Sequence, residues 1–365
     1  MTPGPKDLPL IPADALRDLR PSAPDLAGMW RYRDCIPVSD RAAARATLGE
    51  GLTALVAVDP ELAGVVAKLD FLMPTGSFKD RGAAVLIASA LDRGADSVIA
   101  DSSGNAGSAI AAYATRAGIE CTVFVPESTS AAKRRQISAY GAQLELVPGD
   151  RTATTEAAIA AVERTGVMYA SHVLDPYFIQ GTKTFAYELW EQAGDAPDSV
   201  IVPAGNGTLL LGIARGFAEL LQAGLVRREP ALIAVQSERC APLARAWSEG
   251  SRQPIEVDAG QTAAEGIAIP RPARGAEMLA AVRHSGGCIV TVPEETIAPA
   301  RAALARRGLF VEPTAALVWA AALITRQHPA VRGLGDDPAW AQARSLASRS
   351  VVVPLCGSGL KSPAA

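Results

Sequence analysis

The stretch Thr75-Gly76-Ser77-Phe78-Lys79-Asp80-Arg81-Gly82 places a lysine at the predicted start of a helix. Residues 83–91 read Ala-Ala-Val-Leu-Ile-Ala-Ser-Ala-Leu, and an extended run over 65–73 ends at Pro74. We therefore expect Ser77 to cap the helix and Lys79 to lie in its first turn. The helix dipole disfavours an ammonium there, and a neutral amine is the form that condenses with a carbonyl. Lys79 is thus a candidate Schiff-base residue, although most lysines beside charged neighbours are solvated surface residues.

Composition limits the class of protein. The 365 residues carry 35 basic and 38 acidic side chains, and 49% are hydrophobic. This length predicts two domains. The balanced charge offers no basic stripe for a phosphate backbone, so nucleic acid is not an expected partner. Because no apolar run approaches the roughly 20 residues that cross a bilayer, and no signal-peptide core opens the chain, we expect a soluble cytoplasmic protein with no membrane partner.

Cysteines and histidines point away from disulfides and metals. The five cysteines are odd in number and widely scattered, which indicates reduced thiols and not a disulfide framework. The three histidines, His172, His284 and His328, have no partner at metal-ligand spacing. No metal site is expected.

Two runs of alternating strands and helices follow the lysine stretch. In the first run, strands are expected at 97–100, 120–125, 143–147 and 167–170, with helices at 108–117, 130–140 and 152–165. In the second, strands are expected at 199–202, 231–236, 288–292 and 350–355, with helices at 208–221, 294–307 and 313–327. Short βα connections of this kind predict an α/β fold of two doubly wound lobes with mainly parallel sheets. We expect residues 327–349 to form a variable surface excursion and residues 1–27 a poorly ordered or strapping arm.

Three glycine-rich loops follow predicted strands, at 101–107, 203–209 and 356–359, where parallel α/β sheets bind ligands. Gly205-Asn206-Gly207-Thr208 opens a helix and has the composition of an anion cradle, although an ordinary βα turn has the same composition. It lacks the Gly-Lys-Ser/Thr ending of a Walker loop, and no Gly-x-Gly-x-x-Gly opens a predicted helix. Nucleotide and dinucleotide binding are therefore not favoured.

The loop Ser102-Ser103-Gly104-Asn105-Ala106-Gly107 carries polar groups at a predicted helix start. Asn105 offers an amide to a ring oxygen, and the serines with the first helical amides offer donors to a carboxylate. A capped turn has the same composition. Cys356, at the end of the last predicted strand, is by default a buried small hydrophobe.

Taken in this order, the motifs resemble the pyridoxal-phosphate-dependent enzymes of fold type II, the tryptophan-synthase-β class, and among them the threonine synthases. Pro74 to Gly82 is similar to the lysine motif of that family, Ser103-Gly104-Asn105 to its asparagine loop, and Gly205-Asn206-Gly207 to its phosphate loop. Weaker similarities involve Arg31-Tyr32-Arg33, Lys183-Thr184, Tyr187-Glu188, Glu312-Pro313 and Gly357 to Lys361. The resemblance extends over most of the chain.

The resemblance implies roles for these residues. Lys79 would hold pyridoxal 5'-phosphate as a Schiff base and act in proton transfer, and Asn105 would bond the cofactor's ring hydroxyl. Its phosphate would lie on Gly205, Asn206, Gly207, Thr208 and Leu209, and Cys356 would face the ring nitrogen, which would stay unprotonated. Substrate would meet Ser102, Ser103, Gly104, Ala106 and Phe178. The larger, cofactor-binding domain would comprise 1–85 and 186–365, and a smaller mobile domain 86–185, with the active site between them.

Several positions depart from the threonine synthase pattern. Phe178 stands where those enzymes place an arginine that helps to bind the substrate phosphate, so a charge-assisted anchor is missing. Ala106 replaces a threonine. Cys356 also replaces a threonine, as in some serine dehydratases, and the run at 264–268 is similar to that of threonine and serine dehydratases. These departures leave the substrate open.

Three reactions remain open within the family: threonine synthesis, a serine or threonine dehydratase type of ammonia-lyase reaction, and β-replacement on an activated serine. All are eliminations from a small L-amino acid or its O-phospho ester, with or without replacement. A different class is a non-catalytic paralogue that binds the cofactor or an amino acid. The resemblance also implies a homodimer, and we expect substrate to draw the smaller domain toward the larger one.

Overall fold

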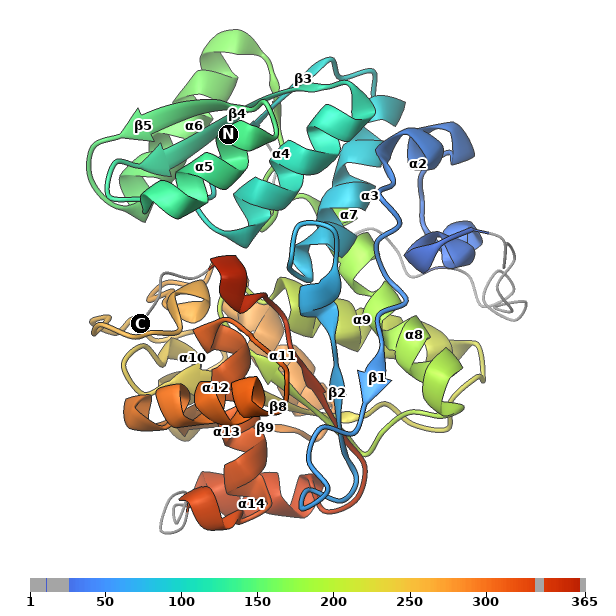
Figure 1. Ribbon diagram of the computed structural model, residues 1–365, viewed down its shortest axis with the longest axis vertical. Helices are drawn as coiled ribbons and strands as arrows, with labels where there is room; N and C mark the ends of the chain where they lie inside the picture. Colours follow the sequence, from blue (N-terminus) through green and yellow to red (C-terminus); the bar gives the residue numbers. More distant parts are fainter. Residues whose placement is uncertain (1–10, 12–25, 332–337, 362–365) are drawn as a thin grey trace. The chain divides into compact units, whose positions relative to one another are not determined.

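The predicted strands pair into two sheets in the computed structural model (Figure 1), which describes residues 11, 26–331 and 338–361. By compactness the chain divides into two units. Unit 1 contains the described residues up to Leu52 together with Met73–Thr184, and unit 2 contains Thr53–Leu72 and the described residues from Phe185 onward. One boundary between the units falls between Thr184 and Phe185, and residues 73–85 group with unit 1, as do the described residues up to Leu52. Assignment of the functional domains stays a prediction.

Unit 1 is built on a four-stranded parallel sheet in the order β5-β4-β3-β6. Its strands are β3 (Ser97–Ala100), β4 (Glu120–Pro126), β5 (Gln143–Val147) and β6 (Met168–Tyr169). Its helices are η1 (Gly28–Cys35), α2 (Asp40–Ala46), α3 (Lys79–Asp92), α4 (Asn105–Ala117), α5 (Ala131–Ala139), α6 (Arg151–Thr165) and α7 (Pro176–Thr182). Each parallel strand is followed by a helix, as the alternating pattern predicts.

The core of unit 1 forms around α3. Residues 80–90 of this helix are all buried, and α2, α4 and α7 pack against it. The apolar run at 83–91 explains this, because a helix that is hydrophobic all round is buried on all sides. The helix that begins with Lys79 is therefore a fixed element of its unit.

Unit 2 contains a six-stranded sheet in the order β1-β2-β10-β7-β8-β9, parallel except for the β1–β2 pair. Its strands are β1 (Leu55–Val56), β2 (Val65–Lys68), β7 (Ser199–Pro203), β8 (Ala231–Ser237), β9 (Cys288–Val292) and β10 (Val351–Pro354). Its α-helices are α8 (Thr184–Ala193), α9 (Thr208–Gln222), α10 (Pro242–Ser248), α11 (Gly275–His284), α12 (Ile297–Arg306), α13 (Pro313–Thr325) and α14 (Pro338–Leu346). Short 3-10 turns are η2 (Asp70–Leu72), η3 (Glu265–Ile267), η4 (Glu294–Thr296), η5 (Pro329–Val331) and η6 (Gly359–Lys361).

Two sequence predictions in this unit were wrong. The extended run expected over 65–73 ends at Lys68, because the chain turns into η2, where Asp70 is buried and accepts a hydrogen bond from the Thr53 hydroxyl at 2.6 Å. The surface excursion expected over 327–349 contains α14, whose Trp340 is buried. The arm expected at 1–27 lies almost entirely outside the described residues.

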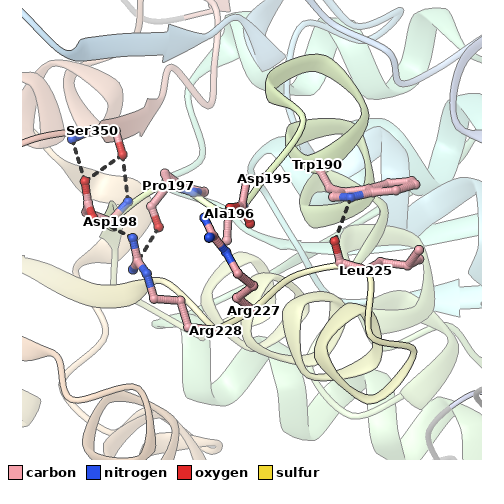
Figure 2. A network of polar contacts seen from close by, with 9 residues as sticks. All are labelled: Trp190, Asp195, Ala196, Pro197, Asp198, Leu225, Arg227, Arg228 and Ser350. Atoms are coloured by element: carbon pink, nitrogen blue, oxygen red, sulfur yellow. Dashed lines mark hydrogen bonds and ion pairs between the residues drawn. The ribbon is translucent and has the colours of Figure 1, made fainter.

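A polar network joins the segments that enter β7 and β10 (Figure 2). Asp198 accepts hydrogen bonds from the backbone and hydroxyl of Ser350 at 2.9 and 2.8 Å and pairs with Arg228 at 2.5 Å. Arg227 pairs with Asp195, and Trp190 donates to the Leu225 carbonyl at 3.1 Å. These contacts lie where the strands begin, at the opposite edge of the sheet from the glycine loop, so they brace the sheet.

Among the helices that the structure describes, none is both long enough and apolar enough to span a membrane.

Candidate active site

Lys79 is the first residue of α3, within a short loop that is closed on itself. The Asp80 carboxylate accepts hydrogen bonds from the backbone N–H of Thr75, at 2.7 Å, and from the Thr75 hydroxyl. Asp80 and Arg81 are fully buried, and so is Thr75. The carboxylate in the first helical turn also suits the helix dipole. The loop that presents Lys79 is therefore held from both sides of the lysine.

Ser77 does not cap α3, contrary to the sequence prediction. The capping position is Phe78, in helical conformation and without a capping hydrogen bond from its side chain. The Ser77 hydroxyl is buried and makes no hydrogen bond to any described residue. The reason is the Thr75–Asp80 contact. With it, the helix begins at Lys79, one residue later than a cap at Ser77 would place its start. A buried hydroxyl two residues from Lys79 is left for a ligand to satisfy.

Two aromatic rings lie beside the Lys79 amine. Its Nζ is 4.6 Å from the centroid of Phe78 and 5.6 Å from that of Phe178, and the residue is half-buried. Ring faces stabilise an ammonium, whereas the helix start destabilises it. The packing of Phe78 and Phe178 beside this amine is a feature that the sequence did not reveal.

Phe178 lies on α7 and is fully buried. Its ring packs on Gly82 of α3 so closely that a Cβ at Gly82 would overlap it. A second close approach, between Gly181 and the backbone oxygen of Arg81, joins the same two helices. Phe178 is therefore a packing residue that also borders Lys79, and its direct contact with substrate stays a prediction.

The asparagine loop leads from β3 into α4, which starts at Asn105 and not at 108 as predicted. Gly104 precedes the helix in an extended conformation, and no described side chain caps it. Ser102, Ser103, Gly104 and Asn105 are half-buried, while Ala106 is buried. Uncapped amides at this helix start are available donors for an anion, as the sequence suggested.

His172 is a residue that the sequence reasoning considered only as a metal ligand. Its ring meets Phe178 edge-on, with 5.9 Å between centroids. Burial lowers the pKa of the imidazole well below 6.5, and the charges of Lys79 and Arg151 lower it further. Its place just after the strand expected at 167–170 is the signal that marks it as a site residue.

The glycine loop of unit 2, at 205–209, approaches its neighbours closely at two glycines. Gly207 precedes α9 at φ +82°, and a Cβ there would lie 2.5 Å from Met278 Sδ. A Cβ at Gly205 would lie 2.9 Å from the Cα of Ile267. Thr208 and Leu209 begin α9, whose first turn is capped by no side chain of the described residues, and Asn206 is half-buried. Bare helical amides behind two glycines suit a phosphate.

The run at 264–268 forms the wall of this loop. Gly266 O and Ile267 Cα are the atoms closest to Gly205, and η3 holds them in place. The dehydratase-like segment of the sequence therefore contacts the predicted phosphate loop directly.

Cys356 follows β10 and is buried. Its thiol donates to Glu312 Oε1 at 3.7 Å, and the Glu312 N–H donates to the Gly357 carbonyl at 2.9 Å. Burial raises the pKa of the thiol well above 9.0, and the carboxylates of Glu312 and Asp70 raise it further. Cys356 is therefore a neutral thiol at physiological pH, which fits a ring-nitrogen partner that brings no charge.

Residues 46–335 match the family model described as "Pyridoxal-phosphate dependent enzyme". The chain belongs to this family. It is 33% identical to a threonine synthase of Methanocaldococcus jannaschii over 79% of this chain and 73% of the relative. With a threonine synthase of a Synechocystis strain it shares 34% identity over 92% of this chain and 84% of the relative.

Solved structures of the family have the same fold. A T.th. threonine deaminase superposes with a TM-score of 0.69 at 28% identity, covering 87% of this chain and 96% of that one. A maize serine racemase gives a TM-score of 0.71 at 22% identity, covering 87% and 92%. The fold is thus that of the fold type II pyridoxal-phosphate enzymes.

The residues present fit pyridoxal phosphate, the cofactor of this family. The glycine cradle that a Cβ would fill suits its phosphate, and the neutral Cys356 thiol suits a ring nitrogen. Within unit 1, Lys79 and Asn105 lie at helix starts, and the Ser77 hydroxyl is buried without a hydrogen bond to a described residue. No three His, Cys, Asp or Glu side chains gather as metal ligands within the part of the chain that the structure describes.

Proposed function

We propose that this pyridoxal-phosphate enzyme is a threonine-synthase-like lyase that eliminates a β or γ leaving group from a small L-amino acid or its O-phospho ester. The observation that carries the proposal is the position of Lys79 at the start of α3, in a chain that belongs to the pyridoxal-phosphate-dependent enzymes. The buried Thr75–Asp80 contact holds this helix start in place. Similarity to threonine synthases supports the substrate class.

The proposed chemistry assigns a task to each group. Pyridoxal phosphate, when bound, supplies an aldehyde for the substrate amine and a conjugated ring that stabilises charge at Cα. Lys79 Nζ would hold the aldehyde at rest and, once displaced, take the Cα proton. In β-elimination the leaving group departs from Cβ with the electron pair of its C–O bond. Phe78 and Phe178 flank the amine, so they limit the access of water to it.

The remaining site residues are proposed from the same resemblance. Asn105 would bond the ring hydroxyl, residues 205–209 the cofactor phosphate, and Cys356 the ring nitrogen. Ser102, Ser103, Gly104 and Ala106 would receive the substrate carboxylate, which the uncapped start of α4 supports.

An ammonia-lyase acting on L-serine or L-threonine is the second candidate. Three features of the sequence favour it. Phe178 stands where threonine synthases place an arginine, and Cys356 and the run at 264–268 are similar to the corresponding residues of dehydratases. The candidates differ in product: an ammonia-lyase releases a 2-oxo acid and ammonia promptly, whereas a threonine synthase releases phosphate and threonine from O-phospho-L-homoserine. A β-replacement enzyme would wait for a nucleophile.

The first test is the visible absorption spectrum of the purified protein, alone and with L-serine, L-threonine, O-phospho-L-serine or O-phospho-L-homoserine, beside Lys79→Ala. A Schiff-base band that is lost in the variant and shifted by one amino acid would support the proposal and identify the substrate class. A band with no turnover of any amino acid would favour the non-catalytic paralogue. Absence of any band after cofactor is supplied would refute the enzyme.

We also propose a homodimer in the cytoplasm. All five cysteines are free and buried, which supports a reducing compartment. Dimerisation rests on the resemblance alone, and light scattering that gives the monomer mass would refute it.

A further inference from the structure

A cluster of polar residues lies at the carboxyl end of the four-stranded sheet in unit 1. β4 and β5 end side by side, since Pro126 pairs with Val147, whereas β3 ends beside Val123 of β4 and β6 ends beside Ile99 of β3. The four following loops therefore share one edge. Besides the asparagine loop, they carry residues that we call the carboxyl-end cluster: Thr129, Ser130, Arg151 and His172.

Two hydroxyls of this cluster lack a partner. Thr129 is only 8% exposed, and neither its Oγ1 nor Ser130 Oγ makes a hydrogen bond to a residue within the described ranges. Both atoms are buried. Buried hydroxyls are nearly always hydrogen-bonded, so two adjacent exceptions indicate a ligand that is bound during function.

Arg151 is directed to the same edge by its helix. It lies one turn before Thr155 on α6, and residues four apart share a helix face. Thr155 donates a 2.6 Å hydrogen bond to Asp101, the residue that follows β3. The Arg151 side of α6 therefore faces the loop that leads to Asn105.

Two carboxylates at this edge accept hydrogen bonds from neighbouring side chains and backbone. Asp101 accepts from Thr155 and from the Tyr169 hydroxyl, and Asp150 caps α6 by accepting from the Ala153 N–H at 3.0 Å. Glu127 is exposed. Burial lowers the pKa of His172, and the positive charges of Lys79 and Arg151 lower it further.

We propose that the carboxyl-end cluster binds the phosphoryl group of an O-phospho ester substrate. The proposal rests on the proposed function and assigns the leaving group. A guanidinium, two hydroxyls and an imidazole N–H supply the charge-assisted and neutral donors that a phosphate monoester needs. His172 of this cluster meets Phe178 edge-on, and the Phe178 ring borders Lys79, so the cluster would supply the phosphate contacts that an arginine at 178 would otherwise make.

The test compares Arg151→Gln with Arg164→Gln in the holoenzyme. Arg164 is exposed in the last turn of the same helix, so it provides a matched control. Binding of inorganic phosphate is measured by calorimetry, and KM is measured for O-phospho-L-serine, O-phospho-L-homoserine and unphosphorylated L-serine. Loss of one charge-assisted contact should weaken phosphate binding and raise the phospho ester KM by about 10- to 100-fold, with the L-serine KM unchanged.

A second variant, Thr129→Val, removes a hydroxyl while keeping side-chain shape and should weaken phosphate binding in the same assay. If phosphate binding and the phospho ester KM are unchanged in both variants, the proposal that the cluster binds the phosphoryl group is overturned, even if the enzyme turns over amino acids. Equal losses for L-serine and phospho esters would also overturn it. If no amino acid is turned over, the proposed function fails, while the calorimetry still decides whether the cluster binds phosphate.

Discussion

At the scale of single residues, the thiol of Cys356 donates a hydrogen bond to Glu312, a contact that the sequence alone did not predict. Glu312 lies against both Gly357 and the thiol, and a Cβ at Gly357 would overlap its carboxylate. Glu312 therefore fixes the direction in which the thiol donates its proton, and it braces the loop that follows β10. Its presence explains why a glycine follows the cysteine.

We expect Glu312→Gln to lower the pKa of the Cys356 thiol, because the substitution removes a negative charge beside it, while burial keeps the pKa above 9.0. The measurement is an alkaline titration of thiolate ultraviolet absorbance, taken as the difference from Cys356→Ser in the same background. Glu295→Gln, at an exposed position in η4, is the control. Identical titrations in Glu312→Gln and the control would contradict the contact.

His172 predicts a loss of stability in acid. Its pKa in the folded chain lies well below 6.5, so the unfolded chain binds a proton that the folded chain does not. Its contribution is complete above about pH 6.5 and is lost as the pH falls below that value. The free energy of unfolding, measured in urea, should therefore fall on acidification more steeply for the wild type than for His172→Gln. The difference in slope is up to about 1.4 kcal/mol per pH unit. Equal slopes would show that the pKa of His172 is the same in the folded and the unfolded chain.

At the scale of elements, the strands that are bounded by polar residues or turns were predicted best. The ranges of β3, β5 and β9 are confirmed to the residue. Helices were missed where the sequence lacks a strong apolar stripe. α10 is a short helix that begins at a proline. α14 begins at Pro338, directly after a Gly/Asp-rich segment that led us to expect a loop.

The candidate site was predicted only where it lies in motifs. The residues of the lysine, asparagine and glycine loops lie at helix starts as expected, because backbone chemistry fixes such positions. The loops that carry Thr129, Arg151 and His172 lie at one edge of the sheet because of strand register, which a single sequence does not display. The rings beside Lys79 were also hidden, because Phe178 reaches it through packing of α7 on α3.

The glycine before α9 yields a prediction with an internal control. Gly207→Ala would impose a left-handed conformation on alanine and press its Cβ against Met278. Gly224→Ala imposes the same conformation (φ +73°) with no described atom within 4 Å of the added Cβ. We expect both to lose about 1–2 kcal/mol of unfolding free energy in urea. Only Gly207→Ala should also weaken cofactor binding, measured by titrating the apoenzyme; equal cofactor affinity in the two variants would contradict the cradle.

At the scale of the whole molecule, the chain enters unit 2 early, leaves it, and returns. Residues 53–72 add β1 and β2 to a sheet whose other strands come after residue 198. Lys68 of β2 fastens this segment to α8 through a fully buried ion pair with Glu188 at 2.7 Å, and its amine also donates to the Thr53 carbonyl at 2.6 Å. This pair ties distant parts of the chain together within unit 2.

Glu188→Gln should destabilise unit 2 by about 3–5 kcal/mol, because it leaves the Lys68 ammonium buried without its counter-charge. Urea unfolding measures the loss. The exposed pair Arg245–Glu249, at 3.1 Å, provides a contrast, since Glu249→Gln should change stability by less than about 1 kcal/mol. Lys68→Met combined with Glu188→Leu should recover most of the loss. If Glu188→Gln lowers the free energy of unfolding by no more than Glu249→Gln does, the Lys68–Glu188 pair does not hold residues 53–72 to unit 2.

The position of β10 also determines when the protein can be completed during synthesis. β10 lies between β2 and β7, pairing Val351 with Val65 on one side and with Ser199 on the other. On the ribosome, β2 emerges long before its parallel neighbour, at translation rates of about 5–20 residues per second. During that interval the edges of β2 and β7 that β10 will cover have no partner from this sheet, and such edges invite association with other chains. A nascent chain that stops short of Val351 is thus expected to be a substrate for chaperones and proteases.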